Sequence, residues 1–255
     1  MMRNLLVRGM LAGLIAGVLA TLFAYFFGEP SVNVAIGLEE SGGHSHATAE
    51  GGHGHGGGED EELVSRGVQS TVGLLTGIGA YGIAIGGLFA VAFAFLHGRV
   101  GTLRPRLTSA LLAAGAFAVV VLVPFLKYPA NPPAVGSAGT IGDRTALYFG
   151  FAALSLVAGI AAVVGGRGLA DRFGAWWGGL LGMGGYIVVM AVCAALLPVV
   201  DEVPAEFPGS TLWTFRTAAL GTQLVLWSAL GLTFGAFAER VLRERAKAPA
   251  PAGQR

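Results

Sequence analysis

The chain has 255 residues, of which 54% are hydrophobic and 12% are charged, and its formal net charge is +1. Soluble domains carry about 25% charged residues, and a soluble fold of this length has too little interior to hide so many apolar side chains. The composition therefore excludes an ordinary soluble domain. The 42 glycines fit helices that pack closely in a lipid bilayer.

Six apolar blocks follow one another along the chain, and each is close to the roughly 20 residues that span a hydrocarbon core. The first block follows a short basic segment but is too long for the apolar part of a signal peptide, so we interpret it as a retained helix. We predict an all-α integral membrane protein. Its transmembrane helices are expected over residues 5–27, 69–96, 107–126, 145–164, 175–197 and 217–238.

The segments between the blocks differ from one another in composition. Glu29–Pro30 is expected to end the first helix, and residues 28–66 form a loop rich in Gly, His and acids that is too polar to build a core. Two further long connections, residues 127–144 and 198–216, contain several prolines. Residues 239–255 form a basic tail that we expect to be disordered.

Charge is divided unequally between the two ends of the predicted helices. Most lysines and arginines lie near the N-terminus, in the two short turns and in the tail; the exceptions are Arg66, Lys127, Arg144 and Arg216. Most acids lie in the three longer loops; the exceptions are Asp171, Glu239 and Glu244. Because cytoplasmic loops are enriched in Lys and Arg, we predict a multi-pass plasma membrane protein with both termini inside and the three long loops outside.

Three of the exceptional cations recur at one position. Arg66, Arg144 and Arg216 each stand within three residues of the start of an even-numbered helix. A proline stands where each odd-numbered helix is expected to end; these are Pro30, Pro124 and Pro198. We infer three helical hairpins of one plan, related by an axis along the membrane normal.

An arginine at a helix N-terminus opposes the helix dipole, so each of these arginines is expected to have a partner. The candidate partners are the outer acids Glu29, Asp201, Glu202 and Glu206. The alternative is that each arginine only reaches a lipid phosphate.

Four of the five histidines stand close together in the first loop, as His44, His46, His53 and His55. Imidazole binds Co²⁺, Ni²⁺, Cu²⁺ and Zn²⁺, and two His-x-His pairs on a glycine-rich chain can supply four nitrogens to one ion. The neighbouring acids raise the local concentration of cations. The pattern predicts capture of a divalent transition metal; the alternative is a low-complexity linker that binds metal as any histidine tract does.

The predicted helices contain almost no charge, although proton-driven carriers usually keep an ionisable group within the membrane. Gln223 and Trp227, one turn apart, are expected to face the bundle interior. We expect most of the polar residues within the helices to form hydrogen bonds between helices; these residues are Gln69, Thr71, Thr76, Tyr81, Ser155, Tyr186, Gln223 and Ser228. Met190 and Cys193 share a helix face and are either soft metal ligands or, more simply, packing residues.

Glycines spaced four apart form several small faces that predict close helix packing. They are Gly9, Gly13 and Gly17; Gly73 and Gly77; Gly82 and Gly86; Gly178 and Gly182; and Gly231 and Gly235. No nucleotide-binding or catalytic motif occurs, and the single cysteine excludes an internal disulfide. We therefore expect neither an enzyme nor a chain that hydrolyses ATP itself.

Two proline-rich phrases carry a family resemblance. The segment VPFLKYPANPPAVG, residues 123–136, precedes Arg144, and LPVVDEVPAEFPGSTLWTFR, residues 197–216, leads into the sixth helix. With the His- and acid-bearing first loop, they make the chain similar to the CbtA family of probable cobalt transporter subunits. The resemblance implies cobalt uptake linked to cobalamin supply, together with a small membrane partner subunit.

The resemblance also implies an outer mouth built from polar and shaping residues of these two phrases. They are Lys127, Tyr128, Pro129, Asn131, Asp201, Glu202 and Arg216. With Glu29, Arg144, Glu206 and Gln223, they form our candidate pathway for the cation. No tightly bound cofactor and no nucleic acid is expected, and the cargo is Co²⁺ or, alternatively, Ni²⁺ or Zn²⁺.

Two other hypotheses remain open from the sequence. In one, the chain is a membrane scaffold whose His loop binds metal to dock a partner. In the other, it is a membrane enzyme with a metal centre at the outer face, which we rank last because a glycine-rich tract holds no rigid coordination site.

Overall fold

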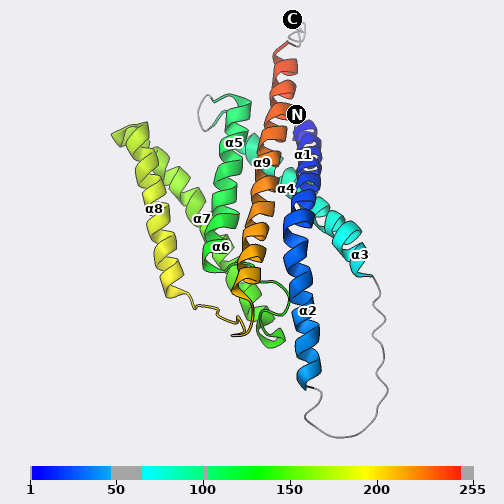
Figure 1. Cartoon of the computed structure of the whole chain (residues 1–255). Coiled ribbons are helices and arrows are strands. Elements are labelled where there is room, and N and C mark those ends of the chain that lie inside the picture. Colours follow the sequence, from blue (N-terminus) through cyan, green and yellow to red (C-terminus); the bar gives the residue numbers. More distant parts are fainter. Residues whose placement is uncertain (1, 47–64, 100–102, 248–255) are drawn as a thin grey trace, which may run out of the picture.

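The computed structural model of the protein describes residues 2–46, 65–99 and 103–247. Its ordered elements are helices, which are labelled in Figure 1. The first part of the chain contains α1 (Met2–Phe23), the π-helix η1 (Ala24–Gly28), α2 (Glu29–His46), α3 (Arg66–Val68), the π-helix η2 (Gln69–Gly73) and α4 (Leu74–Leu96). The second part contains α5 (Pro105–Ala116), the π-helix η3 (Phe117–Leu122), α6 (Val123–Lys127), the 3₁₀-helix η4 (Ala138–Thr140), α7 (Ile141–Phe173), α8 (Ala175–Leu196) and α9 (Gly209–Lys247).

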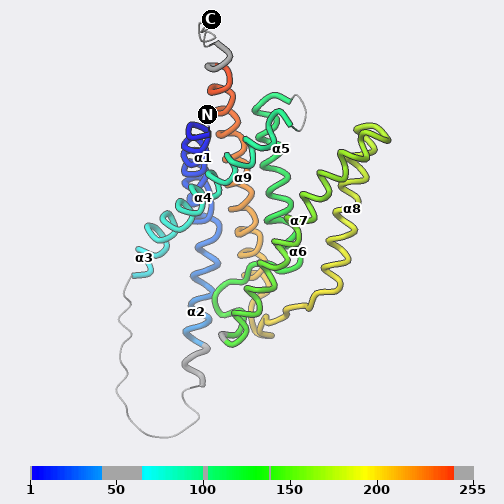
Figure 2. Tube along the Cα trace, turned by 180° about the vertical axis from the view of Figure 1, so that it is seen from behind, coloured from blue at the N-terminus to red at the C-terminus, as the bar shows by residue number. Residues whose placement is uncertain are grey.

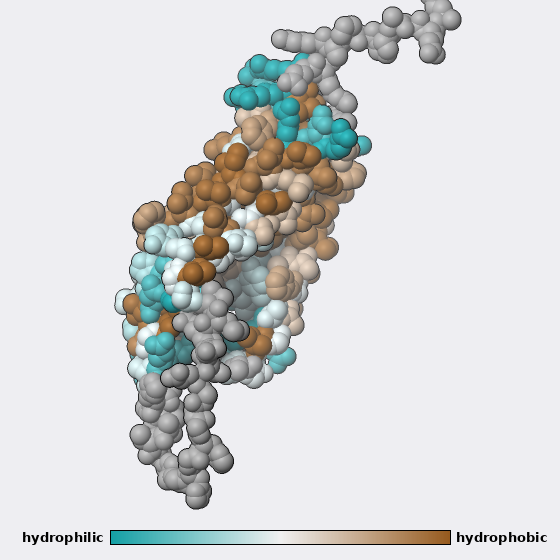
Figure 3. All heavy atoms as spheres, turned by 90° about the vertical axis from the view of Figure 1, so that its right-hand side faces the viewer, coloured by the Kyte–Doolittle hydropathy of each residue, from teal (hydrophilic) through white to brown (hydrophobic). Residues whose placement is uncertain are grey.

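Several of these elements join into longer continuous helices, and six such helices are long and apolar enough to cross a membrane. They run over Met2–Ser41, Arg66–Leu96, Pro105–Lys127, Ile141–Phe173, Ala175–Leu196 and Gly209–Arg243. This confirms the predicted all-α chain with six spanning helices. In Figure 3 a belt of apolar side chains separates two more polar ends, as expected for a molecule surrounded by lipid.

The two ends of the molecule differ in which parts of the chain meet there. The start of α1, the turn between α7 and α8, the start of α5 and the end of α9 lie at one end, which we call the terminal end (Figure 1). The connections from α6 to α7 and from α8 to α9 lie at the other, which we call the loop end, with the end of α2 (Figure 2). The start of α1 and the end of α9 therefore lie at the same end of the molecule.

The closest packing joins α1 to α4, and the glycines predicted for this role make it possible. A Cβ added at Gly9 or Gly13 would collide with the backbone of Gly86 or Gly82 on the facing helix. The same holds for Gly178 and Gly182 of α8, which face the backbone of α7. On α9, a Cβ at Gly231 would collide with the Cβ of Ala113 on α5, and one at Gly235 would lie 3.1 Å from the Cα of Arg106. Gly77 has no neighbour within 4 Å, and Gly73 is near only its own helix, so these two do not form a packing face.

The core of the bundle lies where α1, α4, α5 and α9 meet. Phe234 packs edge to face against Phe89 and Phe93, with ring centroids 5.4 and 5.1 Å apart. Ser109 of α5 donates a buried hydrogen bond of 2.6 Å to the carbonyl oxygen of Gly231 on α9. The pair α7 and α8 stands to one side of this core (Figures 1 and 2).

The structure does not show the three-hairpin plan. The close helix pairs are α1 with α4, α7 with α8, α1 with α9, and α5 with α9. The expected third hairpin of α8 and α9 is not among them. The glycine face of α9 accounts for its pairing with α5, because Gly231 and Gly235 let Ala113 and Arg106 of α5 approach α9 closely.

The prediction that Glu29–Pro30 ends the first helix is wrong. The helix continues through α2 to His46, with the π-helix η1 directly before the proline. A proline in a regular helix clashes with the carbonyl four residues earlier, whereas a π-turn is wider. The backbone N–H of Glu29 bonds to Ala24, five residues back, so the turn that reaches Pro30 is already widened.

Pro124 is accommodated in the same way. The π-helix η3 precedes it, and the N–H of Val123 bonds to the carbonyl oxygen of Ala118. Continuing that pattern, the carbonyl of Val119 would be the acceptor for residue 124, but proline has no N–H. The hydroxyl of Ser155 on α7 donates to Val119 instead at 2.6 Å, and it also lies 2.7 Å from the hydroxyl of Tyr186 on α8. This confirms the predicted interhelical bonding of Ser155 and Tyr186.

Two other helices are longer than predicted. α7 begins at Ile141 and continues through the basic sequence expected to be a turn, and the chain reverses only at Gly174, where φ is +87°. α9 begins at Gly209 and runs to Lys247, into the segment expected to be disordered. Both extensions are polar ends of helices whose central parts are apolar, so a hydropathy pattern underestimates their length.

The contact between α1 and α4 yields a test. Gly13→Ala is expected to destabilise the protein by about 3 kcal/mol, because the added methyl group meets the backbone of Gly82 and neither can move aside. The measurement is the midpoint of unfolding in a detergent titration. Gly77→Ala on α4 is the matched control, since its methyl group meets nothing within 4 Å and should leave the midpoint unchanged or higher. Equal midpoints for the two variants would contradict this account.

Candidate functional site at the loop end

Each of the three arginines that begin even-numbered spans holds a partner at the loop end. Arg66 forms an ion pair of 2.5 Å with Glu29 and donates to the side-chain oxygen of Asn33, one turn further along α2. The Glu29 side chain is only 12% exposed, so little water separates the charges. This tie joins the start of the second span to the first span, and it confirms the predicted partner of Arg66.

Arg144, in the first turn of α7, binds the connection between α8 and α9. Its Nε lies 3.4 Å from a carboxylate oxygen of Glu202, and its Nη2 donates to the carbonyl oxygen of Ser137 at 3.2 Å. The same oxygen of Glu202 accepts the backbone N–H of Ser137 at 3.0 Å. Gly136 has φ +105°, and a side chain there would strike the guanidinium, so only glycine suits this position.

Glu202 is held as a carboxylate. A hydrogen bond from the Thr140 side chain, the Ser137 backbone N–H and the charge of Arg144 lower the pKa of this carboxyl below its usual value. Both side chains of the pair are 22% exposed, so water reaches the pair. Glu202 therefore joins the connection from α8 to α9 to the connection from α6 to α7 and to the start of α7.

Arg216, in the second turn of α9, is bound by neutral oxygens. Its Nη2 donates to the side-chain oxygen of Asn131 at 2.8 Å, and its Nε donates to the carbonyl oxygen of Ala130 at 3.3 Å. Within the described part of the chain, no carboxylate oxygen lies within ion-pair distance of Arg216, although Asp201 is close enough to act on it electrostatically. The predicted acidic partner is thus replaced by an amide.

Lys127 and Tyr128 close the end of α8. The ammonium of Lys127 donates to the carbonyl oxygen of Leu197 at 3.1 Å, and the phenol of Tyr128 donates to that of Pro198 at 2.9 Å. Helix ends leave carbonyls without partners, and these two donors satisfy them. Burial raises the pKa of the Tyr128 phenol, which keeps it a neutral donor. Its ring packs against Phe151 of α7, in a cluster that includes Met190.

A hollow of about 650 Å³ lies among these residues. Its polar lining comes from Tyr128, Asn131, Arg144, Thr145, Tyr148 and Arg216, and the rest is aromatic, proline or aliphatic. The structure thus brings Tyr128, Asn131, Arg144 and Arg216 of the predicted mouth together. Glu29 lies apart with Arg66, while Asp201 and Glu206 are exposed on the connection from α8 to α9.

The metal-binding prediction for the histidine tract falls largely outside the described residues. His53 and His55 lie beyond them, and His44 and His46 are described only as backbone positions at the end of α2. Among the residues whose side chains are described, no three His, Cys, Asp or Glu side chains form a metal-binding group. Met190 and Cys193 belong to the cluster around Phe151, which agrees with packing.

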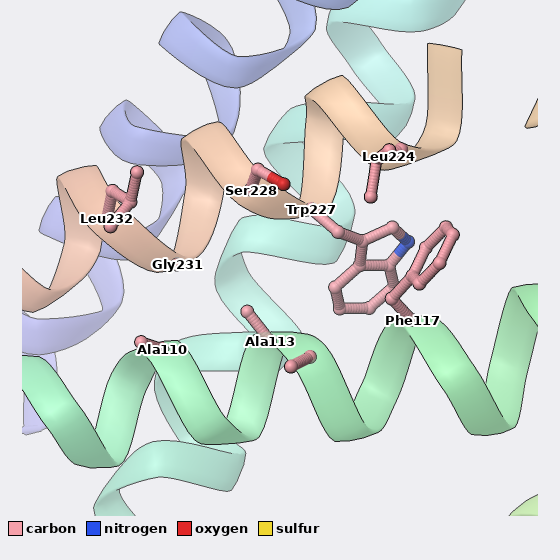
Figure 4. A pocket seen from close by; sticks show the side chains of 9 residues that line it. Ala110, Ala113, Phe117, Leu224, Trp227, Ser228, Gly231 and Leu232 are labelled. Atoms are coloured by element: carbon pink, nitrogen blue, oxygen red, sulfur yellow. The ribbon is translucent and has the colours of Figure 1, made fainter. Parts of the chain in front are cut away.

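Inside the bundle, two polar atoms lack partners among the described residues: Oε1 of Gln223 and Nε1 of Trp227. Trp227 is only 5% exposed, so its N–H is shielded from lipid and water. Figure 4 shows its indole between α5 and α9, beside Phe117 and an apolar hollow of about 290 Å³. This agrees with the prediction that Gln223 and Trp227 face the interior.

Sequence reasoning missed Asn33, Ser137 and Thr140. Asn33 stands four residues after Glu29, a helical spacing that would have identified it had the helix not been ended at Pro30. Ser137 and Thr140 contact Glu202 through a local turn before α7, where the hydroxyls of the two residues are 3.0 Å apart. No sequence spacing relates them to Glu202, because the contact joins segments 65 residues apart.

An all-α chain with six helices long and apolar enough to cross a membrane belongs to the class of multi-pass membrane proteins. Residues 2–239 match the family described as "Probable cobalt transporter subunit (CbtA)", and the chain is a member of that family. Searches among curated proteins and among solved structures found no match. The family places the chain in membrane transport of cobalt.

The Glu202 junction predicts a pH dependence. Because the folded-state pKa of Glu202 is lowered, its stabilising effect is present above the ordinary glutamate pKa of about 4.3 and is lost as the pH falls through the lowered value. At pH 7, hydrogen exchange of the amides near Ser137 should be about threefold slower in the native protein than in Glu202→Gln.

The two proteins should converge as the pH falls through the lowered pKa of Glu202, because residue 202 is then neutral in the native protein as it always is in Glu202→Gln. Glu206→Gln, an exposed acid on the same connection, is the control and should match the native protein at each pH. A difference between native protein and Glu202→Gln that persisted undiminished at pH 3 would contradict the role of the carboxylate.

Proposed function

We propose that the chain is the membrane subunit of an uptake transporter for Co²⁺, which captures the ion on an external His- and acid-rich loop and passes it through the helical bundle. The family match over residues 2–239 is the observation that carries this proposal. The charge distribution supports the direction, because the acids gather at one end of the spans and the basic residues at the other.

The capture step uses residues 28–66, the segment between the first two spans as read from the sequence. His44, His46, His53 and His55 offer imidazoles, which suit Co²⁺ and also Ni²⁺ or Zn²⁺. The acids of the same segment attract cations over about one Debye length, roughly 8 Å at physiological salt. The loop therefore raises the metal concentration beside the bundle and releases the ion easily.

The acids of the proposed outer mouth have two different roles. Asp201 and Glu206 are exposed and meet the arriving cation. Glu29 and Glu202 form ion pairs with Arg66 and Arg144, and these pairs hold the helices and connections of the loop end together. Each carboxylate can bind the metal only when its arginine moves away. Lys127, Tyr128, Asn131 and Arg216 hold the ends of the helices around this opening.

Gln223 supplies a polar ligand for the cation near the middle of the membrane. It lies 14 residues beyond Gly209, about 21 Å along α9 at 1.5 Å per residue. Its amide oxygen has no partner among the described residues and is a hard ligand for a partly hydrated cation. The N–H of Trp227, one turn further, is placed to bind the water that such an ion carries.

A partner completes the proposed transporter. The family name describes a subunit, and the bundle has no carboxylate near its middle and no nucleotide-binding motif. We propose that a small membrane subunit contributes the missing groups in the plasma membrane. The alternative is a scaffold whose His loop docks such a partner without transport; it predicts no metal accumulation by this chain and its partner.

Uptake of radioactive cobalt into cells at limiting concentration tests the proposal. Replacing His44, His46, His53 and His55 by Gln keeps the tract length and is expected to lower uptake about tenfold, because soft nitrogen ligands are lost. Ser45→Ala with Thr48→Ala in the same tract is the control and should change nothing. Nickel and zinc as competitors identify the preferred metal.

The pathway residues are tested in the same assay. Asp201→Asn and Gln223→Leu should each reduce uptake by about tenfold or more at saturating cobalt, where the capture loop no longer limits entry. Normal uptake in both variants would exclude this pathway. Absence of uptake from cells carrying the native chain and its partner would favour the scaffold.

The orientation has its own test. In a Cys193→Ala background, a cysteine placed at Glu50 should react with a membrane-impermeant maleimide added to intact cells, and a cysteine at Arg243 should react only after the cells are opened. The reverse pattern would put the histidine tract in the cytoplasm and would contradict import by this route.

A further inference from the structure

The largest of the hollows described above has a lining that suits an anion. Arg144 and Arg216 both line it, Asn131 adds an amide, and no carboxylate belongs to the lining. The hollow also lies against the first turn of α7, where helix N–H groups add positive potential. This arrangement repels a bare divalent cation, so the hollow beside the proposed opening suits an anion better than the metal itself.

The two arginines are held by different contacts. Arg144 donates Nη2 to the Ser137 carbonyl, while its buried Nε lies 3.4 Å from a Glu202 oxygen without a hydrogen bond. Arg216 donates Nε to the Ala130 carbonyl and Nη2 to the side-chain oxygen of Asn131. Among the described residues, neither Nη1 makes a hydrogen bond. Two guanidiniums fixed by their other donors, each with a remaining N–H donor, form a prearranged pair for an oxyanion.

The charge balance of the neighbourhood also favours an anion. Arg144 is partly neutralised by Glu202 at 3.4 Å, whereas Arg216 has only neutral oxygens in hydrogen-bond contact, with Asp201 acting at longer range. Lys127, whose ammonium donates a hydrogen bond to the carbonyl oxygen of Leu197, adds a further positive charge nearby. Asp143 in the first turn of α7 is exposed and does not line the hollow, so the charged residues of the lining are the two arginines.

The apolar residues that line the hollow indicate the source of the anion. Ile141 and Phe149 line the hollow and are 62% and 65% exposed, so its side opens onto the face that meets lipid. Phe125 and Tyr148 add further apolar surface along the helices. A phospholipid places a phosphate at this level and acyl chains along such walls, and basic pockets between membrane helices bind anionic headgroups.

We propose that this hollow is a binding site for a phosphate-type oxyanion, held by Arg144 and Arg216 and supplied by an anionic phospholipid headgroup or by free phosphate. The site clamps α7 and α9 together at the loop end, since its two arginines come from those two helices. It does not depend on the cobalt proposal, because the binding is measured on purified protein without metal.

The test uses two probes with the purified full chain in detergent. Phosphatidylglycerol retained on the protein is counted by native mass spectrometry, with phosphatidylcholine as the zwitterionic comparison, and inorganic phosphate is measured by equilibrium dialysis. Arg144→Gln and Arg216→Gln should each weaken binding of the relevant probe about tenfold, the loss expected for a charge-assisted hydrogen bond. Arg66→Gln removes a matched arginine that does not line the hollow and should bind as the native protein does.

Asn131→Asp guards against misfolding as an explanation. The change is isosteric and puts a carboxylate at the 2.8 Å contact with Arg216, so it should preserve the fold while it neutralises the site and repels the anion. Loss of lipid binding in this variant supports a headgroup, and loss of phosphate binding alone supports a soluble anion. Binding of both probes that is unchanged in Asn131→Asp, or reduced equally in Arg66→Gln, would overturn the proposal.

Discussion

Every backbone carbonyl and N–H within the hydrocarbon must find its partner inside the protein, because lipid offers none. Pro30 of the first span and Pro124 of the third make this constraint visible, since each proline lacks the N–H that the helix would use at that position. A π-helical turn precedes both Pro30 and Pro124. At Pro124, the hydroxyl of Ser155 donates a hydrogen bond to the carbonyl oxygen of Val119. The same hydrogen bond also contributes to helix packing, because it joins α7 to η3. Tyr186 of α8 contacts the same Ser155 hydroxyl, so three helices meet at this point.

The polar loop end extends the same rule to the membrane surface. Lys127 and Tyr128 satisfy the carbonyls at the end of α8, and Arg216 satisfies the carbonyl of Ala130. These ties cross between segments: the connection from α6 to α7 is bound by α9 through Asn131 and by the connection from α8 to α9 through Glu202. The second and third of the inferred sequence repeats thus exchange contacts, whereas Arg66 and Glu29 pair within the first.

Much of this structure follows from the sequence, and the exceptions have definite causes. Hydropathy predicts six spans, and the glycine spacing predicts the faces at Gly9, Gly13, Gly82 and Gly86, because both depend only on local composition. The stop at Pro30 was wrong because the rule that proline ends a helix assumes a regular α-helical turn, and a π-turn relaxes it. The partner of Arg144 was among the named acids, but that of Arg216 was an amide, Asn131. A charge count does not reveal a neutral acceptor, and no spacing connects residues 85 apart.

The candidate site joins two opposite electrostatic requirements within one surface. A transported cation needs a negative approach, which the sequence supplies through acids such as Asp201 and Glu206 and those of residues 28–66. The connections beside the helix starts present carbonyl and amide oxygens that need donors, which Arg144 and Arg216 supply. Unpaired arginines would, however, repel the same cation. The ion pairs of Arg66 with Glu29 and of Arg144 with Glu202 remove most of that repulsion. Dissolved salt screens the remaining positive charge beyond about 8 Å. The residual positive charge at Arg216 is then felt mainly inside the hollow beside α7, where an oxyanion would neutralise it and leave the exposed acids to govern the approach of metal.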